Sequence, residues 1–146
     1  MGCLTCSEKA GMVAAAQAEL TAAEAEETEA QNTVNEYQQA LSNLNREQTL
    51  ANECKQDNQK ASTAIEQVGT IAGSSLDPNG LLASDAECLE NYSAALTESI
   101  SKCESGLSEA QQWLTRAQQR VQRADKELQR VNSLSCSYSC EEGVNT

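Results

Sequence analysis

Seven cysteines are the most reactive residues in this chain of 146 residues. The chain has no His, which removes Ser-His-Asp and Cys-His nucleophile chemistry and every His-ligated metal site. We therefore expect no enzyme activity, no catalytic residue and no cofactor. Four cysteines lie near the ends of the chain (Cys3, Cys6, Cys136 and Cys140), and three lie in its interior (Cys54, Cys88 and Cys103).

The four terminal cysteines suit more than one chemistry. Disulfides between the two termini would hold the ends of a hairpin together, and closing so long a loop contributes about 2–5 kcal/mol. A four-thiolate zinc site is an alternative, because two residues separate Cys3 from Cys6, as in many zinc sites. Cys136 and Cys140 are spaced more loosely, and neither pair lies in a Gly-containing knuckle. We predict disulfides and no metal.

A third use is lipid attachment. Met1-Gly2-Cys3 resembles the start of dually acylated signalling proteins, such as Src-type kinases and some G-protein α-subunits. The resemblance implies myristate on Gly2, palmitate on Cys3 and a second palmitate on Cys6, which stands where the motif usually has Ser or Thr. Two lipids would anchor the protein stably to a membrane. In this alternative the protein is a membrane-anchored coiled-coil adaptor.

The elements that position these cysteines are long helices. Residues 8–68 contain no Pro, and apolar residues recur at heptad spacing as one seam. Towards its end we expect the stripe to drift to Cys54, Ala61 and Val68, as on a straight helix. The seam comprises Val13, Ala16, Leu20, Ala23, Ala30, Val34, Tyr37, Leu41, Leu44, Ala51 and Ile65, and it is interrupted by Glu27, Gln48, Lys55, Asn58 and Ser62.

A second helix is predicted over residues 85–132, where the heptad seam is cleaner. Gly106 lies off this seam and costs about 1 kcal/mol relative to Ala. Trp113 lies beside the seam, where it either covers the core or anchors another subunit. The seam comprises Leu89, Leu96, Ile100, Cys103, Leu107, Ala110, Leu114, Ala117, Val121, Ala124, Leu128 and Val131.

Residues 69–84 connect the two helices. Gly69 and Gly73 suit a helix C-terminus, and residues 77–80, Asp-Pro-Asn-Gly, are typical of a type I turn. Ser84 and Glu87 form the pattern of a capping box, which predicts that the second helix begins at residue 85.

Two long helices and one connection predict an all-α fold, a long antiparallel two-helix coiled-coil hairpin. Residues 1–146 then form one domain, with cysteine-containing tails at 1–7 and 133–146. If the hairpin turns at the midpoint of the connection, the numbers of residues that face each other add up to about 153. This register predicts the pairs Glu24–Arg130, Glu27–Lys126, Glu29–Arg123, Glu36–Arg116 and Lys55–Glu98.

The same register places the interior cysteines. Cys54 opposes residue 99, one turn from Cys103, and Cys88 opposes residue 65 with no thiol nearby. Cys103 occupies a seam position, where a thiol acts as a small hydrophobic group. We expect Cys88 to be the thiol that is free to join another subunit, and all three remain candidates for bonds between helices or subunits.

Composition limits the partners. The net charge is −12, so a nucleic acid would be repelled. No stretch approaches the roughly 20 apolar residues of a membrane span, and the N-terminal segment does not resemble a signal peptide. We expect no nucleic acid, a membrane only after acylation, and a location that is cytoplasmic or extracellular by a leaderless route.

The leading hypothesis is a structural protein that assembles with copies of itself into a multi-helix bundle or filament. Alanines surround the first helix near its start, and a single seam between two helices is thin. Leu81-Leu82-Ala83, followed by Leu89 and Tyr92, is similar to the turn region of type III secretion needle subunits. That resemblance implies a leaderless secreted hairpin that polymerises. Other helical proteins are alternative partners.

Overall fold

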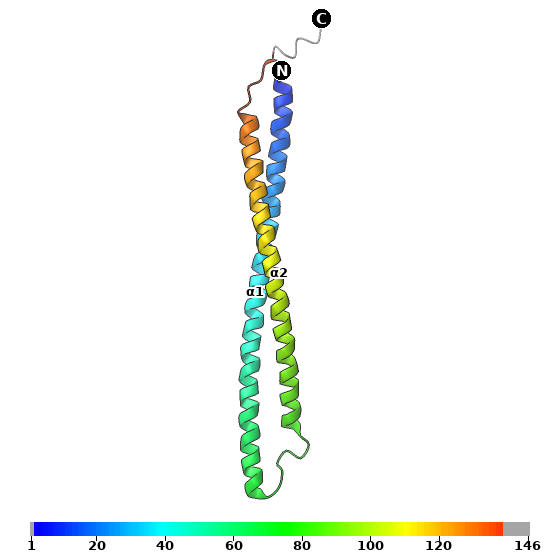
Figure 1. Cartoon of the computed structure of the whole chain (residues 1–146), viewed down its shortest axis with the longest axis vertical. Coiled ribbons are helices and arrows are strands. Elements are labelled where there is room, and N and C mark those ends of the chain that lie inside the picture. Colours follow the sequence, from blue (N-terminus) through cyan, green and yellow to red (C-terminus); the bar gives the residue numbers. More distant parts are fainter. Residues whose placement is uncertain (1, 139–146) are drawn as a thin grey trace. The chain divides into compact units, whose positions relative to one another are not determined.

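The computed structural model describes residues 2–138, which form an antiparallel helical hairpin (Figure 1). Helix α1 spans Cys6–Ala72 and helix α2 spans Leu81–Asn132. Within the described residues, an isolated bridge between Thr5 and Ser137 is the only β-type pairing. The prediction of an all-α hairpin is confirmed. Helix α1 is longer than predicted at both ends, and α2 begins four residues earlier than predicted.

The hairpin consists of two compact units, and each unit contains part of both helices. The terminal unit comprises Met1–Asn35 and Ser108–Thr146, and the loop unit comprises Glu36–Leu107. The division lies near residues 35 and 108. The single domain over residues 1–146 stays a prediction.

Both predicted seams are the faces on which the helices pack. Every seam residue is buried or half-buried in the structure. In the terminal unit Leu20, Ala23 and Ala124 form a cluster against which Val121 and Leu128 pack. Most buried apolar side chains of the described residues are small, and each adds little transfer free energy, about 0.8 kcal/mol per buried methylene. The buried alanines are Ala16, Ala23, Ala30, Ala51, Ala110, Ala117 and Ala124.

The polar interruptions of the first seam stay on the packed face. The Gln48 side chain donates a hydrogen bond to Thr97 at 2.9 Å, and Lys55 forms an ion pair with Glu90 at 3.1 Å. Asn58 donates to the backbone carbonyl of Leu82 at 3.1 Å. The predicted drift of the stripe is therefore wrong: heptad spacing continues through these contacts.

Of the three residues to which we expected the stripe to drift, Cys54 and Val68 are exposed and Ala61 is half-buried, as is the seam residue Ile65. The polar contacts explain this difference, because they hold the same face of α1 against α2 where apolar contacts are sparse.

The register of the helices differs from the predicted one by about three turns. In the terminal unit Cys6 is bonded to Cys136, and the two numbers add up to 142. In the loop unit Asn58 contacts Leu82, and their numbers add up to 140, not 153. The last turns of α1 therefore extend beyond the start of α2 (Figure 1), and the loop returns alongside them.

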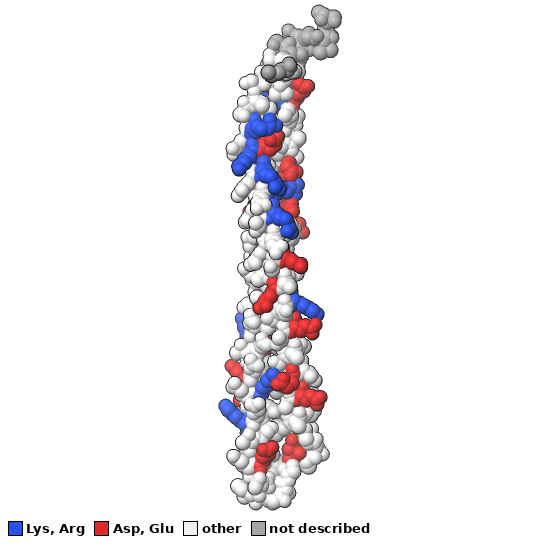
Figure 2. Space-filling model, in the orientation of Figure 1, with Lys and Arg blue, Asp and Glu red and all other residues white. Residues whose placement is uncertain are grey.

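The new register changes the ion pairs. Arg120 bonds to Glu19 and Glu26, Lys55 to Glu90, and Lys102 to Glu98 on its own helix. None of the five predicted pairs is among the ion pairs of the described residues, because the shift separates their charges along the helices. Five of the six basic residues of α2 lie in the terminal unit (Figure 2): Arg116, Arg120, Arg123, Lys126 and Arg130.

The loop fixes where each helix stops and starts. Gly73 has φ +71°, and the Ser74 N–H donates to the Gly69 carbonyl at 3.2 Å, which is a Schellman C-cap. The Gly80 N–H donates to the Asp77 carbonyl at 3.2 Å, as a β-turn requires.

The predicted capping box at Ser84 is wrong. The Asp77 carboxylate accepts hydrogen bonds from the N–H groups of Leu81 and Leu82 at 2.9 and 3.1 Å. Asp77 therefore satisfies the free N–H groups at the start of α2, and Ser84 lies inside the helix.

Candidate functional site

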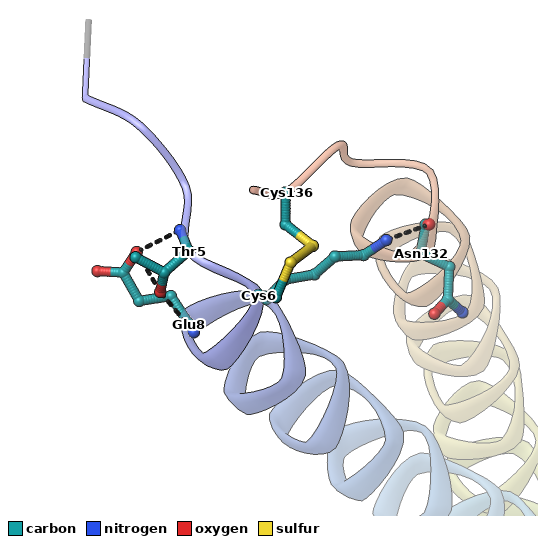
Figure 3. The surroundings of a disulfide bond; sticks show 6 residues. Thr5, Cys6, Glu8, Asn132 and Cys136 are labelled. Atoms are coloured by element: carbon teal, nitrogen blue, oxygen red, sulfur yellow. Dashed lines mark hydrogen bonds between the residues drawn. A yellow bond between two sulfur atoms is a disulfide. The ribbon is translucent and has the colours of Figure 1, made fainter. Parts of the chain in front are cut away.

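At the end of the hairpin opposite the loop, a capping box at Thr5 begins α1 (Figure 3). The Glu8 N–H donates to Thr5 Oγ1 at 3.0 Å, and the Thr5 N–H donates to the Glu8 carboxylate at 2.9 Å. The hydrogen bonds that the Thr5 N–H and hydroxyl donate to the Glu8 carboxylate lower the pKa of Glu8. Thr-x-x-Glu is the pattern that marks a helix start, so the predicted tail over residues 1–7 overlooked a signal that the sequence contains.

A disulfide joins Cys6, the first residue of α1, to Cys136, which follows the end of α2 (Figure 3). The two Cα atoms are 4.9 Å apart, and 130 residues of sequence separate them. The Lys9 ammonium donates to the Asn132 carbonyl at 2.9 Å, which places a positive charge at the C-terminus of α2. The Ser137 N–H donates to the Leu4 carbonyl at 3.1 Å. The segments at the start of α1 and after α2 are therefore tied by the Cys6–Cys136 disulfide and by these two polar contacts.

The other two terminal cysteines are placed differently. Cys3 is also disulfide-bonded, and Cys140 lies outside the described residues. Within residues 2–138, no three Cys, Asp or Glu side chains are grouped so that they could hold a metal ion.

A polar cluster links the helices in the terminal unit. The Arg120 guanidinium donates to both oxygens of Glu19, at 2.8 and 3.1 Å, and also to Glu26. The Trp113 indole N–H donates to the other oxygen of Glu26 at 3.1 Å. We call these four residues the Arg120 clasp. The hydrogen bonds from Arg120 lower the pKa of Glu19 and of Glu26, and they raise the pKa of Arg120.

The Arg120 clasp gives Trp113 a role within one chain. Trp113 is half-buried beside the seam, and its N–H bonds to Glu26. A role as an anchor for another subunit stays a prediction. The predicted pairs between the acidic and basic segments do not include Arg120 with Glu19 and Glu26. In the structure this one Arg bonds to two Glu residues that lie two helical turns apart.

Cys103 and Tyr37 contact each other across the seam of the loop unit. Cys103 is buried, and its Sγ lies 3.4 Å from the Tyr37 carbonyl oxygen. A Cβ built on Gly106 would lie 2.6 Å from Tyr37 Cζ and 2.8 Å from its Oη. Gly106 thus leaves space for the Tyr37 ring, which explains a glycine that costs helix propensity.

Cys54 and Cys88 are exposed thiols in the loop unit. The predicted positions, opposite residues 99 and 65, are wrong. Residue numbers at one level of the loop unit add up to between 140 and 145, as at the Asn58–Leu82 contact and the Lys55–Glu90 ion pair. Cys54 and Cys88, whose numbers add up to 142, therefore lie at one level of the hairpin.

The two thiols also lie on one side of the hairpin. Tyr92 donates a hydrogen bond to Glu47 at 3.1 Å, which raises the pKa of Tyr92. Cys54 follows Glu47 by one heptad, and Cys88 precedes Tyr92 by four residues, so both lie on the side of this bond. Leu50 precedes Cys54 by four residues and is also exposed. We call this surface the thiol flank: Leu50, Cys54, Cys88 and Tyr92.

The loop end carries a hollow and several exposed apolar side chains, of which Leu76 lines the hollow. The hollow lies between the last turns of α1, the loop and the first turns of α2. Its ionisable side chains are Glu66 and Asp77, and the Asp77 carboxylate already caps α2. The hollow therefore offers no acid–base pair, and the exposed apolar side chains of the loop end offer a contact surface. The exposed apolar residues are Val68, Ile71, Leu76 and Leu81.

The chain matches no known protein family, no curated protein and no solved structure. Within the described residues, neither helix has a segment that is long and apolar enough to span a membrane.

Proposed function

We propose that this protein is a non-enzymatic structural subunit that assembles with copies of itself into a bundle or filament. One observation carries the proposal: the Cys6–Cys136 disulfide closes the open end of a hairpin whose fully buried apolar side chains are mostly alanine. A thin seam alone holds two long helices weakly. The covalent closure keeps the hairpin intact as a building unit and suits an oxidising compartment.

The loop end supports contacts between subunits. Ile71 is 88% exposed and Leu81 is 64% exposed, and no basic residue lies between positions 61 and 101. Apolar side chains gathered at one exposed place commonly mark an interaction surface. In the proposed assembly these side chains are covered by other subunits.

Sedimentation velocity over a range of protein concentrations tests the proposal. We expect the full chain to sediment as an oligomer or larger assembly, and Ile71→Asp combined with Leu81→Asp to shift it towards the monomer. Gln59→Glu on the exposed surface of α1 is the charge control and leaves the assembly unchanged. A monomer at every concentration, with the helical circular dichroism retained, would overturn the proposal.

Two alternatives remain as proposals of lower rank. An acylated adaptor needs free sulfur atoms near the N-terminus, whereas Cys6 is bonded to Cys136 and Cys3 is also disulfide-bonded. A leaderless filament subunit similar to type III secretion needle proteins agrees with the hairpin fold. The intact mass before and after reduction separates them, because an acyl chain adds mass and each disulfide removes two hydrogens.

A further inference from the structure

We propose that the thiol flank is a site of covalent cross-linking between two copies of this chain. Cys54 of each copy forms a disulfide with Cys88 of the other. The inference rests on the proposed function, self-assembly, and it names the surface and the bond through which two subunits join.

The register brings the two thiols together on an accessible surface. Cys54 and Cys88 are at one level of the hairpin and on the side of the Glu47–Tyr92 hydrogen bond. Both thiols are free and exposed. Leu50 is 48% exposed and Tyr92 is 46% exposed, and they lie at the adjacent level, where their numbers also add up to 142. Two thiols and two large side chains thus form one exposed patch.

Geometry disfavours a bond within one chain. Packed helix axes are about 8–10 Å apart, whereas a disulfide needs Cα atoms about 4.4–6.8 Å apart. On α1, Cys54 occupies the heptad position that flanks the seam. On α2, Tyr92 occupies the corresponding position, and Cys88 lies at the next position outward. The thiols therefore face a surface that another molecule can cover.

A second copy has the matching arrangement. A two-fold axis parallel to the helices of the loop unit sets α1 of one copy against α2 of the other and keeps every residue at its own level. Cys54 then meets Cys88 of the second copy, Cys88 meets its Cys54, and Leu50 meets its Tyr92. The patch is self-complementary because each level carries the same kind of side chain on both helices. One level has a thiol on each helix, and the next has a large side chain on each helix.

Carboxylates border the patch and weaken the encounter. Asp57 and Asp85 lie on the same side of the helices, three residues from Cys54 and Cys88 respectively, and Glu47 accepts the bond from Tyr92. Like charges would face each other in the dimer, so added salt should increase the yield of the cross-link by screening them.

A small-molecule disulfide, such as oxidised glutathione, is the oxidant. The Cys54 thiolate attacks it, forms a mixed disulfide and releases one glutathione thiol. The Cys88 thiolate of the second copy then attacks the Cys54 sulfur and releases the second thiol. Two protein thiols are oxidised, one glutathione disulfide is reduced, and the two protons remain on the released thiols.

Complementation between single variants tests the proposal. The full chain is incubated with oxidised glutathione and analysed by non-reducing electrophoresis and intact mass. We expect a covalent dimer from the unchanged protein and its loss in Cys54→Ser alone and in Cys88→Ser alone. Mixing the two variants restores a dimer, joined between Cys88 of the first and Cys54 of the second. Cys103→Ser, at a buried thiol, keeps the dimer.

Three outcomes would overturn the proposal: a Cys54–Cys88 bond within monomers, glutathionylated monomers without dimer, or full cross-linking in either single variant. Sedimentation of the Cys54→Ser, Cys88→Ser double variant reports self-assembly separately. If that variant assembles but the unchanged protein never cross-links, only this inference fails. If neither the double variant nor the unchanged protein assembles, the proposed function fails as well.

Discussion

At the scale of the residue, small and polar side chains decide which parts of the two helices meet. Gly106 is the position where the Tyr37 ring crosses the seam. Asn58 and Gln48 form hydrogen bonds between the helices from positions where a heptad normally has apolar groups. Such polar seam residues select one register at some cost in stability.

Gly106→Ala should destabilise the protein, although alanine is the better helix former. The added methyl would enter the space of the Tyr37 ring, and overpacking of this kind costs about 1–3 kcal/mol. Urea unfolding measures the change. Gly11→Ala is the matched control, because no atom lies within 4 Å of the built Cβ, and it should stabilise by up to about 1 kcal/mol. Equal stabilisation by both substitutions would contradict the packing at Tyr37.

Removing Arg120 should make the free energy of unfolding depend less on pH in the acidic range. Arg120 lowers the pKa of Glu19 and Glu26 in the folded protein. The clasp therefore contributes fully above the ordinary glutamate pKa of 4.5, and the contribution is lost as the pH falls through the lowered values.

The measurement is urea unfolding followed by Trp113 fluorescence between pH 7 and about pH 3, where glutamates titrate. Arg120→Gln should flatten the loss of stability at acid pH. Arg123→Gln removes the same charge from an exposed position and should keep the unchanged protein's pH profile. Identical profiles for the two variants would argue against the clasp.

At the scale of the element, the loop determines how α2 starts and how far α1 extends past it. Gly73 ends α1, and Asp77 caps α2 only a few residues later. Asn58 then fixes the first turn of α2 against α1. The connection is therefore shorter than residues 69–84, and it lies beside α1 instead of forming a symmetric bend.

Asp77→Ala should destabilise the start of α2 by about 1 kcal/mol, because two N–H groups lose their acceptor. Amide hydrogen exchange at residues 81–84 should become faster. Ser84→Ala is the control: it lies inside the helix, so the substitution should be neutral or slightly stabilising. The reverse ranking of the two variants would restore Ser84 as the cap.

At the scale of the whole molecule, covalent closure compensates for a thin seam. Alanine dominates the buried side chains, and Val131 is the largest fully buried side chain among the described residues. The Cys6–Cys136 bond limits the freedom of the unfolded chain, since it spans 130 residues. Stability and assembly should both depend on the redox state.

Reduction of the disulfides should lower the free energy of unfolding by up to about 5 kcal/mol, the value that loop-closure entropy gives for a loop of this length. Urea unfolding with and without reductant measures the change. Cys6→Ser with Cys136→Ser should give part of the loss, because Cys3 is disulfide-bonded as well. No change on reduction would mean that the seam holds the hairpin by itself.

The sequence alone determined the two helices, their buried faces, the turn at Asp77 and the position of Cys6 and Cys136 at one end. These features follow from heptad spacing and from Gly and Pro, which act over a few residues. Only the tertiary structure decided the register. Small buried side chains do little to select one alignment of the two seams, so contacts from Asn58, Lys55 and Arg120 select the register. That choice placed Cys54 level with Cys88, which no local pattern in the sequence could reveal.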